Sequence, residues 1–175
     1  MKRQWSVVSV LVSTAVGLGL VASAGADNRG KREEVVRARL IGYSEVPSQS
    51  VPGRGSFRAV IDEDSGTITY TLSYTDVAIT QSHLHFGQHH TNGGITVFLC
   101  TNLGNAPAGV TVQACPAAPA EITGVIMAAQ VLAVPAQGVA AGDFAELLAS
   151  IRNGVVYANI HTPTVPSGEI RGQVF

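Results

Sequence analysis

The chain is poor in charge and in aromatic side chains, and both shortages limit what it can be. Only 13% of its residues are Asp, Glu, Lys or Arg and 6% are aromatic, whereas 46% are hydrophobic. The formal net charge is −1, so the basic surplus typical of nucleic-acid binders is missing. This composition favours a compact β-rich domain over a helical or disordered chain, and no nucleic-acid partner is predicted.

The usual signatures of catalysis are also missing from the sequence. It contains no Gly-x-Ser-x-Gly nucleophile elbow, no Gly-rich phosphate loop and no His-Glu-x-x-His zinc motif. The carboxylates of Asp62, Glu63 and Asp64 stand in a turn sequence, where we expect them to be solvated. We therefore predict no catalytic residues and no enzymatic activity.

A long hydrophobic run occurs only near the N-terminus. Lys2 and Arg3 precede an apolar run over residues 7–21, and small residues follow at 22–26. The run is shorter than the roughly 20 residues of a spanning helix, and its flanks are typical of a signal peptide. We predict that residues 1–26 are cleaved, which leaves a net charge of −3 and a secreted or periplasmic protein without a membrane span. An uncleaved N-terminal anchor is the alternative.

Cysteine is scarce too, with Cys100 and Cys115 as the two examples. In the oxidising compartment that export implies, two cysteines most often pair. Their spacing lacks the clustered Cys-x-x-Cys pattern of a zinc site. We predict a disulfide that closes a turn-rich loop.

The remaining sequence predicts strands and one helix. Residues 27–34 are polar and aperiodic, which favours a flexible leader. Ile68, Tyr70, Leu72 and Tyr74 alternate with hydroxylated residues, as in a half-buried strand of a β-hairpin. Further strands are predicted at 36–40, 56–61, 79–86, 95–99, 122–133, 155–161 and 169–175. A capping-box pattern and apolar residues at helical spacing predict one short helix near 143–153. The fold class is thus all-β, a Greek-key-like antiparallel β-sandwich or barrel.

Histidines are the most distinctive residues of the chain. Four of the five fall within residues 83–90, and the fifth is His161. Residues two apart on a strand share a face, so His83 and His85 should project together. By the same rule His161 shares a face with Asn159 and Tyr157. We expect these two strands to lie close together and to form a polar cluster on the face away from the core.

Three histidines from two strands could hold an ion or could only bond their neighbours. Imidazole suits Zn²⁺ and Cu²⁺, which makes His83, His85 and His161 candidate ligands, with His89 or His90 as a fourth. In the alternative, the histidines bond backbone carbonyls, Thr hydroxyls and Asn159 without any ion. His-x-His by itself leaves both possibilities open.

A second polar motif lies at the C-terminus. Glu169 and Arg171 share one face of the last predicted strand. Arg171 is expected to pair with Glu169 or with Glu45 in the first loop. The pair is either solvated and weak or a buried clamp that ties the first loop to the last strand.

With these segments placed, the chain resembles the chordin-type (CHRD) domain family. The matching stretches occur in the family's order, span nearly all of residues 35–175, and are specific as a set. They are Leu40-Ile41-Gly42-Tyr43-Ser44-Glu45-Val46-Pro47, Ser82-His83-Leu84-His85-Phe86-Gly87, Gly154-Val155-Val156-Tyr157-Ala158-Asn159-Ile160-His161-Thr162 and Gly168-Glu169-Ile170-Arg171-Gly172.

The resemblance implies a secreted β-sandwich domain over residues 35–175, with no established enzymatic activity. Such domains occur singly in bacterial exported proteins and as repeats in chordin, an extracellular antagonist of growth factors. We therefore expect a non-enzymatic binding or structural module whose partner, a protein or an envelope component, the sequence does not identify. The alternative is an extracytoplasmic Zn- or Cu-binding protein that uses His83, His85 and His161. A dismutase-type oxidoreductase is the least favoured function. The His-x-His strand resembles the dismutase sandwich only at the level of fold, and a shared fold is a poor guide to function.

Overall fold

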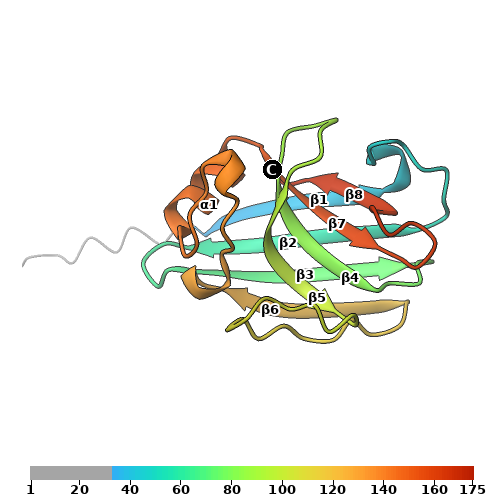
Figure 1. Ribbon diagram of the computed structural model, residues 1–175, viewed down its shortest axis with the longest axis horizontal. Coiled ribbons are helices and arrows are strands. Elements are labelled where there is room, and N and C mark those ends of the chain that lie inside the picture. The colour runs from blue at the N-terminus through green and yellow to red at the C-terminus, as the bar shows by residue number, and fades with distance from the viewer. Residues whose placement is uncertain (1–32) are drawn as a thin grey trace, which may run out of the picture. The chain divides into compact units, whose positions relative to one another are not determined.

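The predicted strands form one antiparallel sheet. The computed structural model describes residues 33–175, so the predicted signal peptide and most of the predicted leader lie outside the described residues. The strands are β1 (Glu34–Ile41), β2 (Arg54–Asp62), β3 (Thr67–Thr75), β4 (Gln81–Phe86), β5 (Gly94–Thr101), β6 (Ala120–Ile126), β7 (Val156–His161) and β8 (Ile170–Gln173). Their order is β5-β4-β7-β8-β1-β2-β3-β6, and the sheet curls into a nearly closed barrel (Figure 1). The all-β prediction is confirmed.

The main core fills the inner face of this sheet. β3 shows the alternation that the sequence predicts, since Ile68 and Leu72 are 1% and 0% exposed while Thr69 between them is exposed. Leu84 of β4 and Ala158 and Ile160 of β7 belong to the same core. The apolar residues of the two histidine-bearing strands thus anchor those strands from within.

The two edge strands, β5 and β6, are bridged by the loop between them. Backbone N–H of Thr101 in β5 donates to the carbonyl of Gln113 at 3.0 Å. The Gln113 side chain donates to the carbonyl of Thr123 in β6 and to the Tyr70 hydroxyl, each at 3.0 Å. Backbone groups that an open sheet edge would leave exposed are thereby partly paired.

Outside the strands, the predicted helix is present as α1 (Phe144–Arg152). Asp143 caps it by accepting a 3.0 Å bond from the backbone N–H of Glu146. The predicted strand 122–133 is shorter than expected. It ends at Ile126 because the next residues turn into the 3-10 helices η2 (Ala128–Gln130) and η3 (Pro135–Gln137); a third, η1 (Gly42–Ser44), follows β1.

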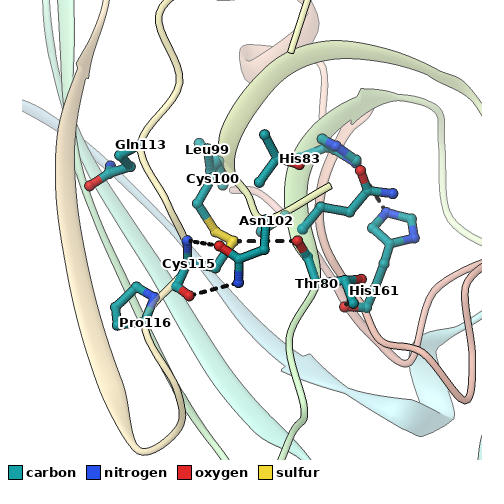
Figure 2. The surroundings of a disulfide bond; sticks show 12 residues. Thr80, His83, Leu99, Cys100, Asn102, Gln113, Cys115, Pro116 and His161 are labelled. Atoms are coloured by element: carbon teal, nitrogen blue, oxygen red, sulfur yellow. Dashed lines mark hydrogen bonds between the residues drawn. A yellow bond between two sulfur atoms is a disulfide. The ribbon is translucent and has the colours of Figure 1, made fainter. Parts of the chain in front are cut away.

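The Cys100–Cys115 disulfide is confirmed, and it lies beside the predicted histidine cluster (Figure 2). Asn102 holds the backbone of Cys115 at both ends, accepting from its N–H and donating to its carbonyl at 2.9 Å. Asn102 N–H also donates to the carbonyl of Thr80 at 2.8 Å, and Thr80 N–H donates to the carbonyl of His161 at 2.9 Å. The cross-linked loop is therefore connected to the end of β7.

Candidate metal centre

The pairing of β4 with β7 brings the three predicted histidines together. In this antiparallel ladder His83 lies opposite Asn159, and His85 lies opposite Tyr157. Since paired residues share a face of the sheet, His83, His85 and His161 all project to the same side. The expected adjacency of the two strands is confirmed.

This polar face is buried, although it points away from the apolar core. His83, His85 and His161 are 0%, 7% and 6% exposed, and all six residues of β7 are buried. The loops after β4 and β7 cover the cluster, because the carbonyls of Gly93 and Pro166 in those loops accept from two of the imidazoles. A polar layer thus lies on the far side of the strands from the main core.

Hydrogen bonds define which nitrogen of each ring is free. Nδ1 of His85 lies 3.0 Å from the Gly93 carbonyl, and Nδ1 of His161 lies 3.0 Å from the Pro166 carbonyl. A carbonyl only accepts, so both Nδ1 atoms carry the proton and both Nε2 atoms keep a lone pair. His83 Nδ1, 3.1 Å from His161 Nε2, must then be the donor of that contact. The lone pair of His83 is left on Nε2.

Two of these lone pairs have no protein partner. Nε2 of His83 and Nε2 of His85 are buried side-chain nitrogens without a hydrogen bond. A buried polar atom without a partner costs about 1–3 kcal/mol, so two in one cluster are unusual. The carbonyls that hold Nδ1 of His85 and His161 orient the rings in the way that backbone carbonyls orient metal-bound histidines.

The cluster is uncharged near neutral pH. Burial, reinforced by the neighbouring His161 and His85, lowers the pKa of His83 to about 2. Burial is also the main cause that lowers the pKa of His85 to about 4 and the pKa of His161 below its ordinary value. Neutral imidazole is the form that binds metal ions, so no proton has to be displaced.

The spacing of the donor nitrogens is close to that of a metal site. One nitrogen from each of the three rings lies within 4.8 Å of the others. Metal–nitrogen bonds of 2.0–2.1 Å place tetrahedral ligand atoms about 3.3 Å apart. The contact of His83 Nδ1 with His161 Nε2 at 3.1 Å shows how closely these two rings approach, and ring rotations would bring the three Nε2 atoms to the metal-site separation.

Aromatic rings enclose the cluster. The rings of His83 and Phe98 of β5 meet edge to face at a centroid distance of 4.2 Å. The ring of His85 stacks on Tyr157 at 4.7 Å with an interplanar angle of 4°. The guanidinium of Arg171 lies 3.4 Å from the centroid of the same Tyr157 ring. Phe98 was not among the predicted site residues, because its place in an apolar strand gives no sign of the contact.

His89 and His90 lie apart from this group. Both are exposed, and His89 stacks on Phe175 at 5.6 Å. Within residues 33–175, the metal-compatible group of three or more His, Cys, Asp or Glu side chains contains His83, His85 and His161 alone. The structure therefore does not bring the fourth histidine that the sequence suggested into the cluster.

The second polar motif supports the cluster from β7 and β8. Asn159 donates to the buried carboxyl of Glu45 and, at 3.1 Å, to the carbonyl of Ile170. Burial raises the pKa of Glu45 to about 7. Thr162 donates to Glu169 at 2.5 Å. The first loop is thus tied to β7 through Asn159.

Arg171 donates to other partners than the two expected carboxylates, although Glu45 interacts with it electrostatically. It is 2% exposed and donates to the carbonyl of Gln88 at 2.9 Å, in the loop after β4. Among the described residues, the ion pairs within 4.0 Å join Arg152 to Glu34 and to Glu63, and none joins Arg171 to Glu45 or Glu169. Arg171 is a buried clamp, but it holds the loop after β4 and the Tyr157 ring.

The fold and this site define an antiparallel β-barrel module with a buried histidine cluster. The CHRD domain family model matches residues 36–174, and the chain belongs to this family. No curated protein and no solved structure matches the chain. Among residues 33–175, no helix is both long and apolar enough to cross a membrane.

Proposed function

We propose that this CHRD domain is an extracytoplasmic, non-enzymatic module in which His83, His85 and His161 bind one Zn²⁺ or copper ion. The observation that carries the proposal is the pair of buried, unpartnered Nε2 atoms of His83 and His85 in a cluster with the imidazole of His161. An ion would take up the free lone pairs of His83 and His85 and would replace the His83 N–H as the partner of His161 Nε2. The carbonyl contacts of His85 and His161 would then serve as outer-shell supports.

The alternative is a cluster that only bonds within the protein. It accounts for the bonds to Gly93 and Pro166 and for the His83–His161 contact. It leaves Nε2 of His83 and His85 unpaired in the interior, at a cost of about 1–3 kcal/mol each. Metal binding is favoured because it removes this cost.

Burial argues for a structural rather than a catalytic ion. A catalytic metal keeps one coordination position open to substrate. Here the most exposed of the three ligands is 7% exposed, and the Gly93 and Pro166 loops cover the site. We therefore place this protein with the family's non-enzymatic modules and give the ion the role of joining β4, β7 and their loops.

Export and partner binding belong to the same proposal. The Cys100–Cys115 disulfide is consistent with an oxidising, extracytoplasmic compartment. A CHRD module in that compartment would bind a protein or an envelope component through the surface of its barrel.

Metal content separates metal binding from the alternative. Tag-free protein is treated with a chelator, exchanged into metal-free buffer, incubated with Zn²⁺ or copper, desalted and analysed by mass spectrometry. One ion per chain is expected for wild type and about tenfold less for His83→Ala and His161→Ala, since a structural site needs its full ligand set. The double variant His89→Ala/His90→Ala is the matched control, because its histidines are exposed and outside the cluster.

The same proteins are compared by circular dichroism before loading, so that loss of metal is distinguished from loss of fold. Metal that is retained equally by His83→Ala and wild type would refute the proposal. So would a folded wild-type protein that retains neither ion.

A further inference from the structure

The electrostatic surroundings of the cluster bear on which ion it prefers. Each of the three donors is an imidazole nitrogen, which binds a metal ion in its neutral form, and no carboxylate belongs to the group. The nearby acids have other partners, since Glu45 accepts from Asn159 and Glu169 accepts from Thr162.

A buried cation lies one ring away from the cluster. The guanidinium of Arg171 lies 3.4 Å from the centroid of the Tyr157 ring, on which His85 stacks. No carboxylate belongs to the ligand set, and the fixed charge beside the His85–Tyr157 stack is the Arg171 cation, which the nearby Glu45 balances in part.

The surroundings also supply few further ligands. Phe98 contacts His83 with its ring, which has no donor atom. The Tyr157 hydroxyl already accepts a 3.2 Å bond from Gly93 N–H. With the three histidines at most 7% exposed, a water ligand would have to be buried as well. The site is thus built for two or three nitrogen ligands.

We infer that the cluster is selective for Cu⁺ over Zn²⁺ and Cu²⁺, an inference that rests on the proposed metal-binding function. The desolvation cost of an ion rises with the square of its charge, so a dication is about four times as costly to bury as a monocation. Imidazole ligands offset part of that difference, but they carry no charge that would cancel the ion's own. Cu⁺ also accepts two- or three-coordinate imidazole sites, whereas Zn²⁺ takes four ligands and Cu²⁺ prefers a tetragonal set.

Competition titrations test the selectivity. Chelator-treated wild-type protein is titrated anaerobically with Cu⁺ against bicinchoninate, and separately with Zn²⁺ and Cu²⁺ against calibrated chelators. We expect a Kd for Cu⁺ at least about 100-fold lower than for either dication, from the charge and coordination differences together. A Kd for Zn²⁺ or Cu²⁺ equal to or below that for Cu⁺ would overturn the selectivity while leaving metal binding intact. Failure of all three ions to bind would overturn both proposals.

Arg171→Met provides a second test of the electrostatic argument. Removing this cation should favour the dications more than Cu⁺, so the ratio of the Zn²⁺ and Cu⁺ Kd values should fall about tenfold. Arg58→Met is the matched control, since Arg58 is an exposed residue of β2. An unchanged ratio in folded Arg171→Met protein would contradict the role given to Arg171.

Discussion

Acidification should destabilise the metal-free protein through the buried histidines. Both His83 and His85 have pKa values far below 6.5, their ordinary value, because they are buried: about 2 and about 4. Below pH 6.5 the unfolded chain binds protons that the folded cluster refuses, so stability is lost as pH falls. Between pH 7 and pH 5 each histidine lowers the free energy of unfolding by about 2 kcal/mol, and the pair lowers it by about 4 kcal/mol. The lowered pKa of His161 adds to the loss.

Glu45 acts in the opposite direction. Its pKa is raised from 4.5 to about 7, so between these values the folded protein holds a proton that the unfolded chain has released. The contribution of Glu45 to the free energy of unfolding therefore becomes less favourable as pH rises. Acidification from pH 7 to pH 5 restores about 2 kcal/mol of that free energy. The expected net loss for wild type is about 2 kcal/mol before His161 is counted.

Glu45→Gln isolates the two effects. Glutamine keeps an oxygen that can accept from Asn159 and removes the ionisation. The variant should be more stable than wild type at pH 7 by about 3 kcal/mol and should lose about 4 kcal/mol by pH 5. Urea unfolding followed by circular dichroism at both pH values, with a chelator present, measures these quantities. A stability that does not change between pH 7 and pH 5 in both proteins would refute the reasoning.

Three further substitutions test the framework around the site by urea unfolding. Replacing both Cys100 and Cys115 by Ala should cost about 3 kcal/mol through loss of loop closure, and an unchanged midpoint would contradict it. Gly168→Ala should cost more than about 2 kcal/mol, because Gly168 has φ of +134° and a Cβ there would lie 2.8 Å from Asn159 and Glu45 atoms. Gly66→Ala is its control, with positive φ and open space, and should cost about 1 kcal/mol. Asp143→Ala should cost about 1 kcal/mol by removing the cap of α1, and no effect would show the cap to be dispensable.

Much of this fold is predictable from local pattern. The alternation from Ile68 to Tyr74 and the apolar spacing of α1 reflect the burial of one face of an element, which the sequence records directly. The histidine cluster was predictable for the same reason. His83 and His161 each lie on the polar side of a strand whose other side is apolar.

The covering of that polar side was not predictable. The groups that close over the cluster are backbone carbonyls of Gly93 and Pro166, and a carbonyl has no residue-type signature. The partner of Arg171 was missed for a related reason. Its charge suggested Glu45 or Glu169, but the tertiary structure gives it an aromatic ring and the Gln88 carbonyl instead.

X-ray absorption spectroscopy of the metal-loaded protein tests the central claim most directly, because it reports the ligands of the bound ion. If His83, His85 and His161 hold the ion, the spectrum will show up to three imidazole nitrogens at about 2.0 Å, and the signal will be lost in His161→Ala. A shell of oxygen atoms without imidazole scattering, or an identical spectrum from His161→Ala, would contradict it.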